Sequence, residues 1–231
     1  MPVLRLSIVR GLAFVLGLSV TPFLHADNWQ LDVEDNGIKL YTKIGSNSPM
    51  KSYRAVTTIK ATLSSLVGLL NDSSKFPEWM DKVLSVEKIR DISANESLVY
   101  QVIDAPWPAK DQDNILYSKW SQDPDTLVVT KKVLAEPQYL NEFDDRRRQK
   151  FYEAEWRLTP LKDGYVEVVY MAEIHPGGEK VMEWMENMLA YDMPVKTMKN
   201  LRAKSLQRYS GVRVAYIKEP SRSELVMVTE E

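Results

Sequence analysis

The feature that most constrains the fold of this chain is a run of six consecutive segments in which apolar and polar residues alternate. They are separated by turn signals such as Asp123-Pro124-Asp125 and Lys162-Asp163-Gly164, and they span residues 83–92, 97–105, 113–121, 126–135, 147–158 and 165–174. Alternation with a period of two is typical of strands that bury one face. Because strands joined by short connections pair antiparallel with their chain neighbours, the pattern predicts an antiparallel meander.

A second block of secondary structure precedes the meander. Residues 37–41 and 53–59 alternate and are rich in β-branched and aromatic side chains, with a turn-like segment at 45–49 between them, so we expect two more strands. Thr62 then precedes apolar residues at helical spacing, which predicts a helix with Thr62 as its N-cap. A second, short helix is expected at 76–80.

After Pro176-Gly177-Gly178 the apolar period becomes helical and predicts one long amphipathic helix from about Val181 to Tyr209. Pro194 removes a backbone donor inside this helix and should kink it near Ala190. Five of the nine methionines beyond Met1 lie here, at positions 182, 185, 188, 193 and 198. Such a stripe is either ordinary core or a surface that adapts to apolar ligands, because methionine is flexible and polarisable. The kink favours a cavity, since a bent helix packs imperfectly on a sheet.

The first 26 residues predict a secretory signal peptide. Arg5 and Arg10 are its charged residues, positions 11–23 are mainly apolar, and Ala26 offers a small residue for cleavage. The apolar stretch is shorter than the roughly 20 residues of a membrane-spanning helix. We therefore expect a periplasmic or secreted protein with one domain at 27–210 and a polar, mobile C-terminal tail at 211–231.

Composition excludes several classes of chemistry. The chain has no cysteine, which removes thiol nucleophiles, disulfides and thiolate metal sites. Beyond the signal peptide the only histidine is His175, so a multi-histidine metal centre is excluded and we expect no metal and no cofactor. Removing Arg5 and Arg10 from the 30 basic residues leaves 28 against 32 acidic residues, and this balance argues against nucleic acid as a partner.

A proline-bracketed loop at 105–113 carries Trp107 between two of the predicted strands. Either this loop folds back onto the core, or it presents its tryptophan to a membrane surface or to the mouth of a pocket. Composition leaves both alternatives open, and the exposure of Trp107 in the folded protein separates them.

A set of short motifs occurs in a characteristic order along residues 27–209. The order is Trp29, Gly37-Ile38-Lys39-Leu40-Tyr41, Asp72, Trp79-Met80, Pro106-Trp107-Pro108, Asp111, Asp113, His175-Pro176-Gly177-Gly178, Trp184, Asn187, Pro194 and Leu201-Arg202. In this order and spacing the chain resembles the START (steroidogenic-acute-regulatory-protein-related lipid transfer) domain family. The resemblance implies an α+β helix-grip fold, in which a curved antiparallel sheet wraps the long C-terminal helix and encloses one hydrophobic cavity. Gln112 stands where the family often has arginine.

Strand alternation predicts that Arg148 shares a face with Tyr152 and Trp156. If that face lines the cavity, the guanidinium requires an anion, either a ligand headgroup or an internal carboxylate. The residues expected to line the cavity are Tyr100, Val102, Leu116, Val128, Arg148, Trp156, Tyr170, Trp184, Met188, Tyr191 and Met198.

The expected function is non-catalytic binding, and transfer, of a lipid or other hydrophobic small molecule by a monomer that contacts membrane surfaces transiently. Burying a chain of about 16 carbons contributes roughly 13 kcal/mol before ordering costs, so shape alone suffices for capture. The alternative is a helix-grip enzyme of the cyclase or hydratase type, which requires a carboxylate, a tyrosine and an arginine deep in the cavity. A third alternative, an envelope chaperone or scaffold, predicts no enclosed cavity.

Overall fold

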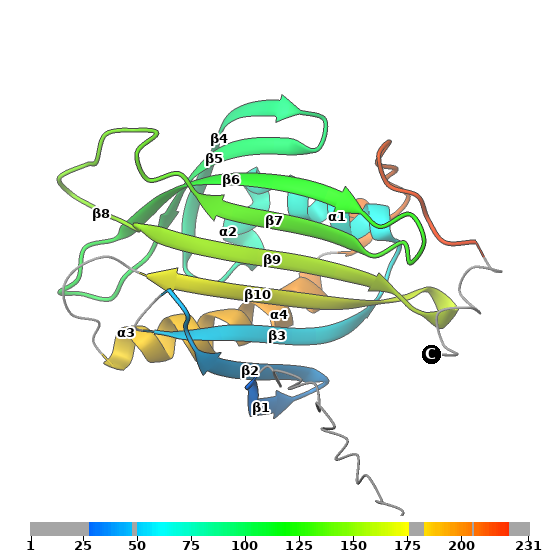
Figure 1. Cartoon of the computed structure of the whole chain (residues 1–231), viewed down its shortest axis with the longest axis horizontal. Helices are drawn as coiled ribbons and strands as arrows, with labels where there is room; N and C mark the ends of the chain where they lie inside the picture. The colour runs from blue at the N-terminus through cyan, green and yellow to red at the C-terminus, as the bar shows by residue number, and fades with distance from the viewer. Residues whose placement is uncertain (1–27, 48–49, 176–182, 205, 222–231) are drawn as a thin grey trace, which may run out of the picture.

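The computed structural model describes residues 28–47, 50–175, 183–204 and 206–221. Its strands form one ten-stranded sheet, and Figure 1 shows the helices gathered behind that sheet. We call the side of the sheet that carries the helices the helix face and the opposite side the outer face. The predicted signal peptide at 1–26 lies outside the described residues.

The sheet contains the predicted meander. Its strands are β1 (Gln30–Asp35), β2 (Ile38–Ile44), β3 (Lys51–Lys60), β4 (Val83–Ser93), β5 (Glu96–Ile103), β6 (Gln112–Gln122), β7 (Val129–Ala135), β8 (Arg147–Arg148), β9 (Phe151–Pro160) and β10 (Tyr165–His175). The strand order is β1-β2-β3-β10-β9-β7-β6-β5-β4, with antiparallel pairing along this path, and β8 pairs parallel with β6 off the path. The meander and the two N-terminal strands are confirmed, whereas β1 was not predicted.

Two helices carry the chain from β3 to β4 at the far edge of the sheet. Helix α1 (Leu63–Asn71) begins at the predicted N-cap, where Thr62 Oγ1 accepts a hydrogen bond from the Ser65 amide at 3.1 Å. A 3-10 turn, η1 (Ser73–Lys75), and the short helix α2 (Phe76–Trp79) follow, as the pattern at 76–80 predicts. Apolar residues on α1 and α2 pack on the helix face and close one end of the core.

The C-terminal helix is present but interrupted. It comprises α3 (Glu183–Asn187), the π-helical turn η3 (Met188–Asp192), α4 (Met193–Lys204) and α5 (Leu206–Tyr209). Pro194 has no N–H to donate to the Ala190 carbonyl, and the π-turn that contains Ala190 accommodates this missing donor at the predicted kink. Val181 and Met182 lie outside the described residues. No helix among those described is both long and apolar enough to cross a membrane.

The segment after Gly211 differs from the mobile tail that we expected. As far as Ser221 it is part of the fold: Val212 and Tyr216 pack against the core. The Glu219 carboxylate accepts hydrogen bonds from the backbone amides of Leu63 at 3.0 Å and Ser64 at 2.7 Å. A carboxylate at this position satisfies free amides and complements the dipole at the N-terminus of α1.

Candidate functional site

A row of large side chains crosses the helix face in register. Trp120 on β6 lies opposite Lys131 on β7, Lys131 opposite Trp156 on β9, and Trp156 opposite Tyr170 on β10. We call these four residues the aromatic row. The rings of Trp156 and Tyr170 stack with centroids 4.0 Å apart and an interplanar angle of 7°. Every member is buried, and its three aromatic residues form the sheet side, or floor, of the hydrophobic core under the helices.

Three more aromatic residues extend this floor. Tyr53 on β3 meets Tyr170 edge-on at 5.3 Å, and Trp79 on α2 meets Trp156 edge-on at 6.1 Å. The hydroxyls of Tyr152 and Tyr170 hydrogen-bond at 2.9 Å. Burial raises the pKa of Tyr53, Tyr152 and Tyr170 well above the usual value of a phenol, so all three stay neutral.

The indole N–H of Trp79 is buried without a hydrogen-bond partner among the described residues. Buried polar groups are normally paired, and an unpaired one costs about 1–3 kcal/mol. This N–H therefore offers a donor to a polar atom of a bound molecule.

The methionines of the C-terminal helix form a second apolar cluster. Met185, Met188, Leu189 and Met193 pack with Met50, which precedes β3, and both Trp184 and Ala109 pack against the cluster. Ala109 belongs to the 105–113 loop, so this loop and the helix meet through these side chains. Flexible thioether side chains make the cluster an adaptable wall.

A chain of buried amides connects β6 with this methionine cluster. Asn114 Nδ2 donates to Gln149 Oε1 at 2.7 Å, Gln149 Nε2 donates to Gln112 Oε1 at 2.6 Å, and Gln112 Nε2 donates to Met185 Sδ at 3.7 Å. Gln112 is the residue that stands where the related family often has arginine. The position is thus occupied by a neutral, hydrogen-bonded side chain in this protein.

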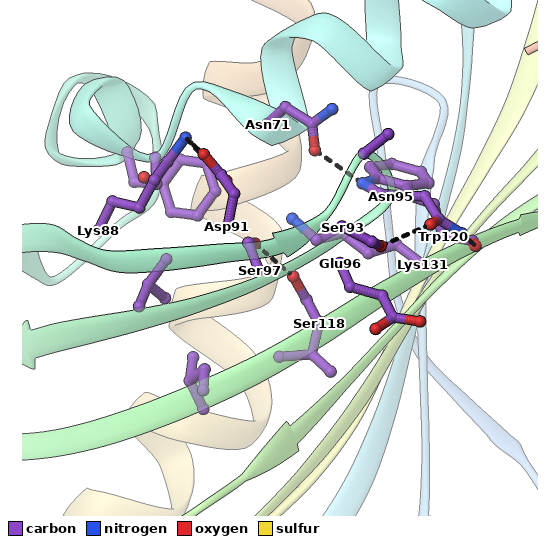
Figure 2. Close-up of a pocket in the computed structure, with 16 residues that line it drawn as sticks. Asn71, Lys88, Asp91, Ser93, Asn95, Glu96, Ser97, Ser118, Trp120 and Lys131 are labelled. Atoms are coloured by element: carbon purple, nitrogen blue, oxygen red, sulfur yellow. Dashed lines mark hydrogen bonds and ion pairs between the residues drawn. The ribbon is translucent and has the colours of Figure 1, made fainter. Parts of the chain in front are cut away.

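A pocket of about 490 Å³ opens between the helix face and the segment from α1 to α2 (Figure 2). We call it the Lys131 pocket. Its apolar walls include Phe76, Val99, Leu116 and Val133. The remaining lining residues are Asn71, Ser73, Lys88, Asp91, Ser93, Ala94, Asn95, Glu96, Ser97, Ser118, Trp120 and Lys131. Since Trp120 and Lys131 belong to both, the pocket reaches one end of the aromatic row.

Lys131 is the buried cation of this pocket. Only 8 % of the residue is exposed, and its Nζ lies 5.3 Å from the centre of the Trp120 ring and 5.8 Å from that of Phe76. Nζ donates a hydrogen bond of 2.7 Å to the carbonyl of Leu70 in the last turn of α1. Burial lowers the pKa of Lys131 to about 7, because the charged form loses hydration.

Seven of the predicted lining residues lie on the helix side of the sheet, where most are packed in the two hydrophobic clusters and Leu116 lines the Lys131 pocket. Leu116, Trp156, Tyr170 and Met198 are part of the core on the helix face. Trp184 and Met188 belong to the methionine cluster. Tyr191 packs at the edge of the core, and its hydroxyl accepts a hydrogen bond from Lys51 Nζ at 2.5 Å.

Three of the predicted lining residues lie on the outer face instead. Tyr100 and Val102 pair with Ile115 and Asp113, which alternate with the helix-face residues of β6. Arg148 stands opposite Asp113 on the same side. The prediction for Arg148 was wrong because the strand breaks between β8 and β9, so alternation counted back from Trp156 does not continue to position 148.

Arg148 has an internal carboxylate as its partner. The guanidinium binds Asp113 through two hydrogen bonds, from Nε to Oδ1 at 2.9 Å and from Nη2 to Oδ2 at 3.0 Å. Its other three N–H groups donate to the carbonyls of Pro137, Leu140 and Asn141 at 2.8, 2.9 and 3.1 Å. All five donors are thus used beneath the loop between β7 and β8, and Arg148 has none left for a ligand.

The prediction for Val128 is displaced by one residue. Leu127 has a positive φ of 58°, and the strand begins only at Val129. Val129 is fully buried in the core, whereas Val128 lies beside Arg157 and Thr159 near the end of the sheet. Sequence reasoning also missed Lys131, although it has the same parity as Val129 and Val133, which was the available signal.

Comparisons with known proteins agree with this architecture. A model of the START domain matches residues 21–209. An uncharacterised protein of Pseudomonas aeruginosa is 28 % identical over 207 residues, which cover 89 % of this chain and 98 % of the relative.

Solved structures give the same result. A STAR-related lipid transfer protein from Xanthomonas axonopodis is 28 % identical, with a TM-score of 0.70 over 77 % of this chain and 98 % of that one. Human StAR-related lipid transfer protein 5 shares the fold, with a TM-score of 0.66 at 14 % identity over 80 % of this chain and 86 % of its own. With a family model that matches most of the chain, this protein belongs to the START domain family.

Proposed function

We propose that this protein captures one apolar or amphiphilic molecule between the sheet and the C-terminal helix, as an exported monomer, and carries it without chemical change. Membership of the START domain family implies a lipid or other hydrophobic ligand. The observation that carries the proposal is the pairing of a rigid aromatic floor with an adaptable methionine wall, each on the helix face. Export rests on the N-terminal signal pattern, and the fractionation of cells that express the full chain tests it.

Binding is favoured over catalysis by where the ionisable groups lie. An enzyme in this cavity would need a carboxylate, a tyrosine and an arginine together. Such a cluster exists, since Asp113 accepts from both Tyr100 and Arg148, but it lies on the outer face. On the helix face the buried tyrosines have raised pKa values and do not act as bases near neutral pH.

Replacing Met188 with arginine is expected to abolish lipid uptake. Met188 is buried in the methionine cluster, and a guanidinium there would place a charge inside the apolar wall. Titration of delipidated protein with a fluorescent fatty acid, followed by tryptophan fluorescence, measures the loss. Circular dichroism shows whether the variant is still folded.

The exposed neighbour Asn187 on the same helix provides the matched control. Asn187→Arg introduces the same charge outside the cluster and should leave uptake within about twofold. Normal uptake by Met188→Arg would place the ligand elsewhere. Unfolding of that variant alone would identify the methionine cluster as ordinary packed core.

Membrane contact is proposed for the loop between β5 and β6. Its Trp107 is 93 % exposed, so the loop does not fold this side chain onto the core. Trp107→Ser is expected to reduce sedimentation with phosphatidylcholine and phosphatidylglycerol vesicles about tenfold, because an indole at the lipid interface contributes on the order of 1–2 kcal/mol.

Ile44 on β2 is 87 % exposed, does not belong to this loop and supplies the control. Ile44→Ser removes a comparable exposed apolar side chain and should leave vesicle binding unchanged. Equal losses in both variants would show that general surface hydrophobicity, and not the loop, governs the contact.

A further inference from the structure

The Lys131 pocket contains a buried ammonium group without an acidic partner in the part of the chain that the structure describes. Its single hydrogen bond goes to the uncharged carbonyl of Leu70, and two of its three N–H groups remain for other acceptors. The faces of Trp120 and Phe76 stabilise the cation only partly. Since buried charges are normally paired, the site lacks one negative charge.

The walls of the pocket restrict what that charge belongs to. Phe76, Val99, Leu116 and Val133 are apolar, and the volume of about 490 Å³ is within the range of about 300–1,000 Å³ that is usual for small-molecule sites. In the same pocket, Ser97 and Ser118 share a hydrogen bond of 3.1 Å and add two hydroxyls to the lining. An occupant with an apolar body and one anionic end fits this distribution.

The charges among the remaining lining residues favour a monoanion. Lys88 is held by Asp91 at 3.2 Å, and Glu96 is paired with Lys119 at 2.8 Å. Lys131 is thus the one lining cation without a carboxylate partner among the described residues. One carboxylate balances the single unpaired cation of the lining, whereas a phosphate with two negative charges leaves one in excess.

We propose that the Lys131 pocket binds the carboxylate of an amphiphilic acid, with Lys131 Nζ as the counter-ion and the acid's apolar chain against the apolar walls of the pocket. The inference rests on the proposed function, because it names the class of ligand for that binding space. The lining supports this placement, since Lys131 and the apolar side chains of Phe76, Leu116 and Val133 belong to the same pocket. The plain alternative is that Lys131 only caps the C-terminus of α1 through Leu70.

The test compares laurate with its neutral methyl ester on delipidated protein, followed by tryptophan fluorescence. Wild-type protein should bind laurate at least about tenfold more tightly than methyl laurate. Lys131→Met should remove this preference and leave the affinity for the ester unchanged. Lys132→Met, which removes the exposed lysine next along β7, should keep the preference.

The possible results distinguish the carboxylate site from hydrophobic ligand binding in general. If the wild-type protein binds acid and ester equally, the carboxylate site is refuted while hydrophobic binding stands, and this comparison needs no variant. A preference for acid that persists in Lys131→Met would also refute it and leave Lys131 as a helix cap. Tighter binding of dodecyl phosphate than of laurate would overturn the assignment to a carboxylate. If neither laurate nor methyl laurate binds saturably, the proposed function itself fails.

Discussion

Replacing Arg148 with methionine is expected to lower the free energy of unfolding by about 3–5 kcal/mol, because it leaves the Asp113 carboxylate buried without its partner. Arg148 and Asp113 are each only 1 % exposed. The arginine also donates hydrogen bonds to three carbonyls of the loop between β7 and β8. Urea denaturation followed by circular dichroism measures the change. Such a loss is a large part of the 5–15 kcal/mol that stabilises a typical domain.

Two controls identify the cause of this loss. The double variant Arg148→Met with Asp113→Leu removes both charges and should recover much of the stability. The neighbouring Arg147 is exposed, and Arg147→Met should change the free energy of unfolding by less than about 0.5 kcal/mol. A loss below about 1 kcal/mol for Arg148→Met would contradict the buried ion pair. Because this pair lies on the outer face, no selective loss of anionic ligands is expected.

Replacing Lys131 with methionine should have the opposite effect and stabilise the ligand-free protein by about 3 kcal/mol at pH 6. Burial lowers the pKa of Lys131 to about 7 from the usual value of 10.5 for a lysine. At about 1.4 kcal/mol per pKa unit this shift corresponds to an upper limit near 5 kcal/mol. The variant also loses the hydrogen bond to Leu70, which offsets about 1–2 kcal/mol of this stabilisation.

The stability difference between the wild-type protein and Lys131→Met should depend on pH. Between about pH 7 and pH 10.5 the unfolded chain holds more protons at Lys131 than the folded chain, so wild-type stability from this group rises with pH across that window. The penalty is complete below pH 7 and absent above 10.5. The other ionisable groups that line the pocket, Lys88, Asp91 and Glu96, are common to both proteins. Denaturation at pH 6 and pH 10 should therefore show the advantage of the variant shrinking, and a constant difference would contradict a buried charge.

Arg148 and Lys131 show how much of the site could be predicted from the sequence. Alternation places Trp156 and Tyr170 correctly because β9 and β10 each have one continuously apolar face. It fails at β5, where Leu98 and Val102 on the outer face are as buried as Ile103 on the helix face. The loop between β7 and β8 covers the outer face there. The alternation of apolar and polar residues in a strand does not reveal that a loop covers its second face.

Lys131 was missed for a related reason. A lysine beside Lys132 in a strand is ordinarily assigned to solvent, and only its parity with Val129 and Val133 points inward. Similarly, the polar composition after Gly211 predicts a mobile tail. The structure instead uses a single carboxylate, Glu219, and a few apolar side chains to hold this segment against α1. Tertiary contacts made by isolated residues are invisible to composition.

The pairing of β3 with β10 also determines the order in which this fold is assembled. Ala55 and Tyr170 are partners although more than 100 residues separate them along the chain. During synthesis the edge of β3 therefore has no partner strand until β10 has been made, which is late in the sequence. The sheet is completed late, when β10 pairs with β3.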